Sequence, residues 1–120
     1  MMSPQRQAIE SQYTGKGTIT EYIAKTDSIT KLTKHTEKDV LKDEPCRVSY
    51  KNITVSNSTN TGTITKQIIK LFIAPELDIK PGSKITVTQN GVTTVYKNSG
   101  KAGVYDSHQE VILELFDGWA

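Results

Sequence analysis

The chain has 120 residues, of which 35% are hydrophobic and 23% are charged, and its net charge is +2 at neutral pH. This length fits one domain that forms a core without disulfides or metal. A single cysteine excludes a disulfide framework, no apolar run approaches the ~18 residues of a membrane span, and the mild charge does not indicate a nucleic-acid binder. The many threonine, isoleucine and valine residues favour strands over helices.

Residues 1–15 form the one predicted helix, or an N-terminal arm. Ser3 is a favourable N-cap, Pro4 suits the first helical position, and Gly15 lies where a helix would end. Ile9 and Tyr13 are four residues apart and therefore share one helix face. This narrow apolar stripe predicts either a helix packed at the edge of the domain or an arm that docks on a partner through Ile9 and Tyr13.

Extended segments follow the helix. Residues 18–24 and 29–41 are predicted strands, and the second is polar enough for an exposed sheet edge. In residues 46–50 apolar and polar residues alternate, which predicts a half-buried strand with Cys46, Val48 and Tyr50 on its inner face. We therefore expect Cys46 to be a small core residue rather than a nucleophile or a metal ligand.

Residues 52–63 are the one low-complexity segment. They carry no charged residue and little apolar surface, so burial cannot offset the entropy lost on ordering them. The sequence therefore predicts a mobile surface loop, which consists of Asn52, Ile53, Thr54, Val55, Ser56, Asn57, Ser58, Thr59, Asn60, Thr61, Gly62 and Thr63.

The second half of the chain is more regular. Residues 64–74 are a predicted long strand, and Asn90-Gly91 predicts a tight hairpin over residues 84–97 with Ile85 opposite Tyr96. In that register Val92 faces inward. A last predicted strand covers residues 110–116, with Leu115 on its inner face.

These elements predict an all-β fold, with six to seven strands and one short N-terminal helix. Short strands with turn signals about every ten residues are typical of a small antiparallel β-barrel or sandwich. We expect residues 1–120 to form this single domain.

Candidate catalytic and metal-binding groups do not converge in the sequence. His35, His108 and Cys46 lack the short spacing of metal ligands. Asp106, Ser107 and His108 include the residue types of a catalytic triad, but adjacent side chains point in different directions and a triad must converge in space. The sequence therefore predicts no enzyme, no cofactor and no metal site.

Four segments resemble a known family: LFIAPELDIKPGSK (71–84) with the following ITV (85–87) and Asn90-Gly91, PCRVSY (45–50), VYDSHQE (104–110) and DGWA (117–120). They are similar to the minor capsid or head-completion proteins of tailed bacteriophages that infect Gram-positive bacteria. The resemblance covers about half the chain and consists of structural residues rather than a catalytic motif.

The resemblance implies a β-barrel that forms a six- or twelve-fold homo-oligomeric ring at the head–tail interface of the virion and is assembled in the cytoplasm of the host bacterium. Its partners would be portal or adaptor proteins, tail proteins and, by passive contact, packaged double-stranded DNA, with no membrane involved. In similar stopper proteins a loop closes the channel, and the uncharged residues 52–63 are the candidate plug. A tail-completion or tail-terminator ring protein is an alternative, and a sugar- or nucleic-acid-binding β module is a further one.

Overall fold

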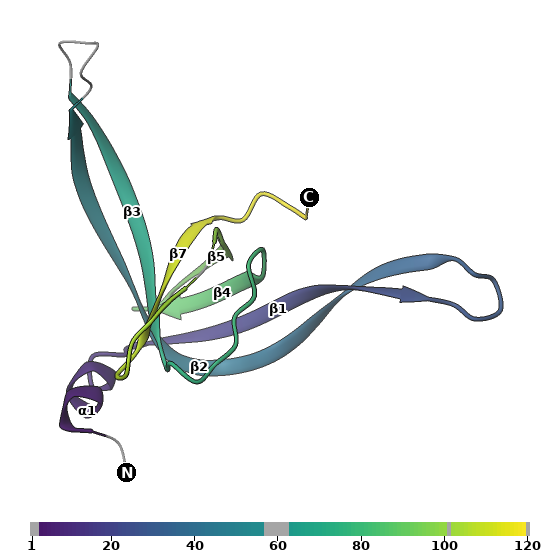
Figure 1. The fold of residues 1–120 in the computed structure, drawn as a ribbon, viewed down its shortest axis with the longest axis horizontal. Helices are drawn as coiled ribbons and strands as arrows, with labels where there is room; N and C mark the ends of the chain where they lie inside the picture. Colours follow the sequence, from purple (N-terminus) through teal and green to yellow (C-terminus); the bar gives the residue numbers. More distant parts are fainter. Residues whose placement is uncertain (1–2, 57–62, 101, 120) are drawn as a thin grey trace.

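The computed structural model describes residues 3–56, 63–100 and 102–119, without the side chains of 53–56 and 63–64. Its seven strands form one antiparallel sheet in the order β3-β2-β1-β4-β5-β7-β6, and β3 also pairs with β7. That last pairing closes six of the strands into a ring, so the fold is a small β-barrel rather than a sandwich (Figure 1). The predicted all-β fold is confirmed.

Strands of unequal length build this barrel. One short helix, α1 (Pro4–Glu10), precedes β1 (Gly15–Thr26), β2 (Thr33–Ser56) and β3 (Thr63–Ile73). The shorter strands β4 (Lys84–Gln89), β5 (Val92–Asn98), β6 (Gly103–Val104) and β7 (Gln109–Leu115) complete the sheet.

The barrel encloses one apolar core. Isoleucine, valine and leucine dominate it because their side chains alternate between the two faces of each strand, with one face turned inward. Its buried members are Ile19, Cys46, Val48, Leu71, Ile73, Ile79, Ile85, Val87, Tyr96, Val111 and Leu113.

The hairpin of β4 and β5 has the predicted register. Ile85 is paired with Tyr96, and Gln89 with Val92. Asn90 and Gly91 both have positive φ values, of 53° and 77°, as a two-residue turn between right-twisted strands requires. This local turn therefore sets the register of a hairpin whose inner face contributes to the core.

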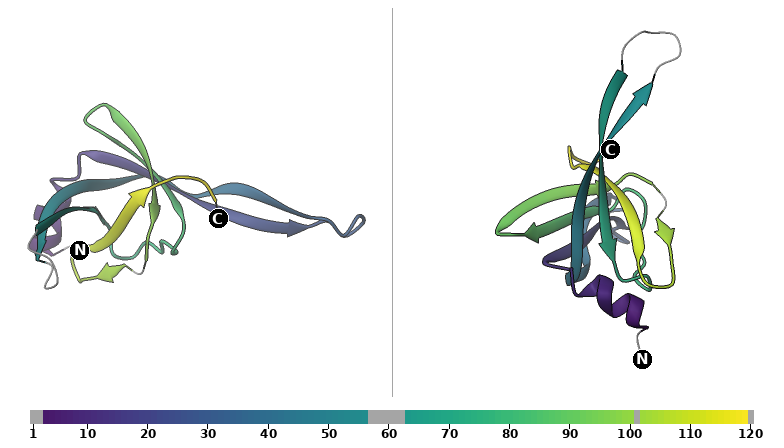
Figure 2. Two further views of the ribbon diagram at one scale, coloured as in Figure 1. Left: turned by 90° about the horizontal axis from the view of Figure 1, so that it is seen from above. Right: turned by 90° about the vertical axis from the view of Figure 1, so that its left-hand side faces the viewer.

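Two long hairpins project from the barrel in different directions (Figures 1 and 2). The first consists of β1 and β2, and the second of β2 and β3, so the 24 residues of β2 contribute to both. The radius of gyration is 17.4 Å, compared with about 14 Å for a compact domain of this length. Much of the chain therefore lies outside the barrel.

Irregular pairing lets β2 take part in both hairpins. Against β1 it shifts register twice, between Gly17 and Ile19 and between Ile19 and Thr20, and each shift inserts one extra residue into β2. Asp43, in this stretch, has a φ of 51°. Such bulges bend a strand and increase its twist. The two predicted strands at 29–41 and 46–50 are therefore parts of one bent strand, which begins at Thr33.

The N-terminal helix is shorter than predicted. Ser3 caps it as expected, because its Oγ accepts a hydrogen bond from the Arg6 N–H at 3.2 Å, and Pro4 occupies the first turn. The helix ends at Glu10, and Gly15 begins β1 instead of ending the helix. A side chain at Gly15 would lie 3.1 Å from the Cys46 carbonyl oxygen, so this close strand contact favours glycine.

The predicted loop at residues 52–63 is wrong for the half of it that the structure describes. Asn52–Ser56 belongs to β2 and Thr63 begins β3, with Asn52 paired with Gln67 and Ser56 with Thr63. Residues 57–62 lie outside the described part of the chain. The prediction failed because backbone pairing that starts in the barrel continues outward regardless of how little apolar surface the segment holds.

Three side chains predicted to face the core are exposed instead. Tyr50 is 54% exposed, Val92 63% and Leu115 64%. Each lies at the end of the barrel portion of its strand, where no opposite layer remains to cover the inward face. The alternation of apolar and polar residues identifies which residues share a face of the strand. It does not show where along the strand the barrel ends.

Candidate interaction surfaces: two projecting arms

The two projecting hairpins are the main exposed surfaces of the chain. We define the β1–β2 arm as residues 21–26 with 33–38 and the β2–β3 arm as residues 50–56 with 63–69. Every residue from 22 to 40 is exposed. Isolated two-stranded hairpins are at best marginally stable in water, so the β1–β2 arm depends on contacts near its base.

The turn at the end of the β1–β2 arm is tightly ordered by one aspartate. The Asp27 carboxylate accepts hydrogen bonds from the Ile29 N–H at 2.8 Å and the Thr30 N–H at 3.4 Å, and the Lys31 N–H bonds to the Asp27 carbonyl. Beyond these polar contacts the turn presents apolar surface, because Ile29 is 89% exposed and Leu32 is 61% exposed.

An aromatic stack connects the base of this arm to the C-terminal segment. Trp119 stacks on Tyr22 with ring centroids 4.8 Å apart, and Tyr22 stacks in turn on His35 at 5.1 Å. Phe116 contacts Trp119 edge to face. Residues far apart in sequence therefore hold the arm against the end of β7.

Glu37 adds polar contacts to the same place. The Trp119 Nε1–H donates to the Glu37 carboxylate at 2.9 Å, and the Lys84 ammonium lies 3.1 Å from it. These two contacts hold the pKa of Glu37 below its ordinary value. Lys84 also lies over the Phe116 ring, 5.2 Å from its centroid. The base of the β1–β2 arm is thus joined to β4 and to the C-terminal segment by both stacking and charge.

A glutamine side chain holds the base of the β2–β3 arm. Gln89 Oε1 accepts from the Val48 N–H at 2.8 Å, and Gln89 Nε2 donates to the Val48 carbonyl at 3.2 Å. Nearby, the Tyr50 and Tyr96 hydroxyls are hydrogen-bonded to each other. Burial, together with this bond, raises the pKa of Tyr96 to about 12.

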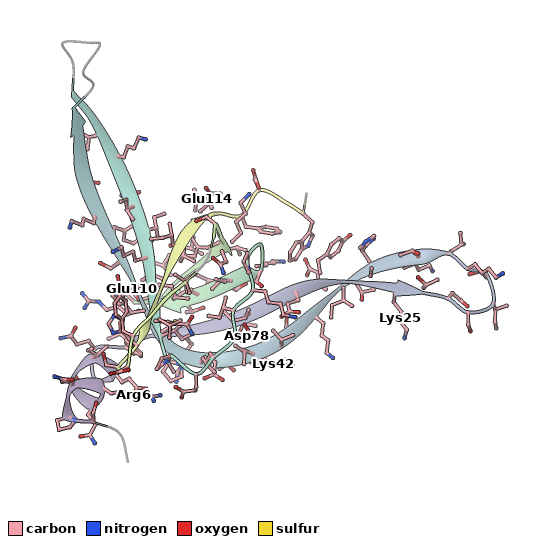
Figure 3. All side chains as sticks on the ribbon, viewed as in Figure 1. Arg6, Lys25, Lys42, Asp78, Glu110 and Glu114 are labelled. Atoms are coloured by element: carbon pink, nitrogen blue, oxygen red, sulfur yellow. The ribbon has the colours of Figure 1, made fainter. Side chains whose placement is uncertain are left out.

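A charged and aromatic cluster lies where β7 begins, at the labelled position of Glu110 in Figure 3. The Glu110 carboxylate binds Lys70 Nζ and His108 Nε2, each at 3.1 Å, and Ser107 Oγ lies 3.0 Å from His108 Nδ1. Burial alone would raise the pKa of Glu110, but these two hydrogen bonds lower it. Since a carboxylate only accepts, His108 Nε2 carries a proton, and in the neutral imidazole Nδ1 then accepts from the Ser107 hydroxyl.

The Ser107–His108–Glu110 chain differs from the expectation that these side chains diverge. Ser107 and His108 do touch, and Glu110 rather than Asp106 supplies the carboxylate. Tyr105 stacks on His108 with centroids 5.0 Å apart. The contacts join β7 to the loop before it and to β3.

The predicted docking residues Ile9 and Tyr13 lie together on the barrel of their own polypeptide, beside His108. With Gln12, Arg47, Phe72 and His108 they line a pocket at the end of the barrel. Burial raises the pKa of Tyr13 to about 12. Arg47 donates to Gln12 at 2.8 Å. Both predicted residues are half-buried, and their docking on a partner stays a prediction.

The α1 helix also has an ionic contact with the barrel. Arg6 binds Glu10 within the helix at 2.8 Å and Glu76, after β3, at 2.6 Å. These contacts and the Gln12–Arg47 hydrogen bond orient the N-terminal segment.

Other candidate groups have structural positions. Cys46 is fully buried, and burial raises the pKa of its thiol to about 12, as expected of a core residue. Across the described ranges, no group of three or more His, Cys, Asp or Glu side chains is placed to share a metal ion. Within those ranges, too, no helix has the length and apolar character needed to cross a bilayer.

Sequence reasoning missed both arms as projecting features, although it placed several of their strands. Their signal was the long polar stretch after residue 29 and the absence of charge over residues 52–63. The roles of Trp119 and Gln89 had no local signal, because each depends on a strand distant in sequence.

The architecture is that of a small closed antiparallel barrel with two hairpin arms. No protein-family model and no curated protein sequence matches the chain. Among solved structures it is similar to xkdH, a protein of the phage-like element PBSX of Bacillus subtilis, with a TM-score of 0.52 and 14% sequence identity. The alignment covers 85% of this chain and 92% of xkdH. At this identity the likeness concerns the fold.

Proposed function

We propose that the chain is a structural protein of a tailed-phage particle, and specifically a ring-forming subunit of the head–tail connector. The observation that carries the proposal is the pair of long arms on a small barrel. The arms expose surface that the barrel of the same chain leaves uncovered. The fold likeness to a protein of a phage-like element and the sequence resemblance to head-completion proteins both support it.

The arms suit a ring of identical subunits. Ring contacts are heterologous, so one surface of each subunit meets a different surface of the next. An arm that extends beyond its own barrel can contact a different surface on the next subunit, as a heterologous interface requires. The proposed partners are further copies of the chain, the portal or adaptor above, tail proteins below and the DNA between them. The role is structural rather than catalytic.

The finer assignment is closure of the DNA channel after packaging. Residues 52–63 remain the proposed plug, although Asn52–Ser56 and Thr63 belong to the end of the β2–β3 arm. Position supports this assignment, because the outer ends of β2 and β3, at Ser56 and Thr63, lie far from the barrel core (Figure 1). Deleting residues 54–62 should leave rings able to assemble but produce particles that lose their DNA; particles that keep it would exclude the plug.

Electron microscopy of particles assembled without this protein tests the main proposal. For a head-closure protein, we expect tailless particles whose heads have lost their DNA. Full, sealed heads without tails would instead assign the protein to the tail side, as a tail-completion or tail-terminator ring. Normal tailed particles would overturn the proposal, and complementation with the intact gene is the control.

A further inference from the structure

The small net charge of the chain conceals an uneven distribution. Of the fifteen basic and thirteen acidic residues, four basic and no acidic ones lie in residues 46–75. This segment therefore carries +4, and the remaining eleven basic and thirteen acidic residues carry −2. Its described part consists of the end of β2 from Cys46 to Ser56, all of β3, and Ala74 and Pro75 after it.

All four basic residues lie on one face of this hairpin. Arg47 is paired with Phe72, Ser49 with Lys70, Lys51 with Ile68 and Ile53 with Lys66. Directly paired residues, and residues two apart along a strand, share a face. Arg47, Lys51, Lys66 and Lys70 therefore form one row, which we call the basic stripe.

The basic stripe faces away from the barrel core. The opposite face of the same strands holds Cys46, Val48, Leu71 and Ile73, which are all buried. Along β2 the stripe extends from residue 47 to residue 53, the partner of Lys66, which is about 20 Å at the usual rise per residue of a strand.

Three of the four charges are available to a partner. Lys70 is paired with Glu110 at 3.1 Å. Arg47 is exposed, and among the described residues its side chain donates to the neutral Gln12 and to no carboxylate. Lys51 and Lys66 are exposed, and neither forms an ion pair with any residue that the structure describes.

We infer that the basic stripe binds the phosphate backbone of double-stranded DNA through Arg47, Lys51 and Lys66. A two-stranded ribbon fits the major groove of B-DNA, and lysine and arginine are the main phosphate ligands. Lysine is depleted in the cores of protein interfaces, so the stripe favours a polyanion over a protein partner. The inference deepens the proposed function and rests on it for the source of the DNA, which is the packaged genome.

The contacts are expected to be independent of base sequence. Duplex DNA presents one phosphate charge per ~1.7 Å of axis. A stripe of this length therefore contacts several phosphates wherever along the duplex it binds. Three contacts give a dependence of log affinity on log salt of about −2.7 for each bound protomer. Such binding holds DNA weakly at physiological salt and permits its later movement.

Fluorescence anisotropy of the full chain with a labelled duplex of arbitrary sequence tests the inference. Raising salt from about 50 to about 200 mM should weaken binding about 40-fold for each bound protomer. In the double variant Lys51→Gln/Lys66→Gln one contact remains, so the same salt change should weaken binding only about 3.5-fold. The salt slope should thus fall to about one third of the original, whatever the number of protomers bound.

The β1–β2 arm provides a control with the same change in charge. Lys25 and Lys34 are exposed and directly paired on that arm, and Figure 3 shows Lys25 far from the β2–β3 arm. Lys25→Gln/Lys34→Gln should keep the original affinity and salt slope. Lys51→Arg/Lys66→Arg changes the same two side chains but keeps their charge, and it should also keep the original affinity and salt slope. It therefore distinguishes an effect of lost charge from an effect of altered folding.

Three results would overturn the inference. One is the absence of duplex binding by the unaltered chain at about 50 mM salt, where phosphate contacts are strong. The second is equal weakening by both glutamine pairs, which would show a net-charge effect. The third is altered self-association in Lys51→Gln/Lys66→Gln with unchanged DNA binding, which would assign the stripe to a neighbouring subunit. Particle microscopy, which tests the connector role, is a separate measurement that none of these results decides.

Discussion

Gln89 replaces a missing strand with a side-chain amide. The first strand begins at Gly15, which is paired with Cys46, so Val48 lies beyond the end of β1 and loses that backbone partner. Gln89 meets both the N–H and the carbonyl of Val48. The amide thus continues the hydrogen bonding of the barrel at the point where the β2–β3 arm leaves it.

Replacing this amide should destabilise the fold measurably. Gln89→Met keeps the side-chain length but leaves the Val48 N–H and carbonyl without their partner, which costs about 1–3 kcal/mol of unfolding free energy. Urea denaturation monitored by circular dichroism measures the loss. Gln67→Met, at an exposed site on β3, is the matched control and should change stability by less than about 0.5 kcal/mol. Equal effects of the two substitutions would show that the amide contacts do not matter.

Residue-scale features were predictable where the pattern is local. Alternation along residues 46–50 placed Cys46 and Val48 correctly in the core. It failed at Tyr50, which is exposed because the barrel ends before it. The position of that end depends on where β1 begins relative to β2, and no local pattern in β2 records it.

At the scale of elements, the C-terminal segment determines how the β1–β2 arm is held. Trp119 stacks on Tyr22 and donates a hydrogen bond to Glu37, so it contacts both strands of the arm. Over its described residues, 116–119, the segment adds only one backbone hydrogen bond beyond β7, from the Phe116 N–H to the Val95 carbonyl. Its stacking therefore contributes directly to the stability of the arm.

Hydrogen exchange should detect this contribution. An aromatic pair is worth about 0.5–1.5 kcal/mol, so Trp119→Ala should speed amide exchange in the β1–β2 arm between about twofold and tenfold while leaving core strands protected. Trp119→Phe keeps a stacking ring but loses the N–H, and its effect should be smaller. Tyr105→Ala removes a similar exposed stack, with His108, and should leave the arm unchanged. Unaltered exchange in Trp119→Ala would contradict this role of the stack.

The elements themselves were predictable to different degrees. The register of the β4–β5 hairpin was predicted correctly, because Asn90-Gly91 sets both its turn and its pairing. The end of the β2–β3 arm was predicted as a loop, since its composition offers little burial. Pairing of Asn52 with Gln67 continues a ladder whose register the barrel has already determined, so the composition rule did not apply.

On the scale of the whole molecule, the two arms differ in chemistry. Residues 21–38, the β1–β2 arm with its turn, contain three acidic and four basic residues, and the turn exposes Ile29 and Leu32. The β2–β3 arm holds Lys51 and Lys66 of the basic stripe and no acidic residue. An arm of mixed charge with an apolar end suits contact with a neighbouring subunit, and the basic arm suits DNA.

Shortening each arm separately tests this division. Residues 23–36 can be replaced by Asn-Gly, because Tyr22 and Glu37, which flank them, are directly paired. None of the buried hydrophobic core residues lies in that stretch, so the barrel should stay folded, with the unfolding free energy changed by less than about 1 kcal/mol. Sedimentation velocity should show that the ring is lost.

The matched variant replaces residues 53–66 by Asn-Gly between the paired Asn52 and Gln67. It should keep the ring, because the β1–β2 arm and its apolar turn remain, and it should lose the DNA contact made through Lys66. Rings that survive removal of residues 23–36 would contradict this assignment, and rings lost only on removal of residues 53–66 would reverse it. The barrel would then hold the same two arms with their roles exchanged, and the basic stripe would lie between subunits rather than on DNA.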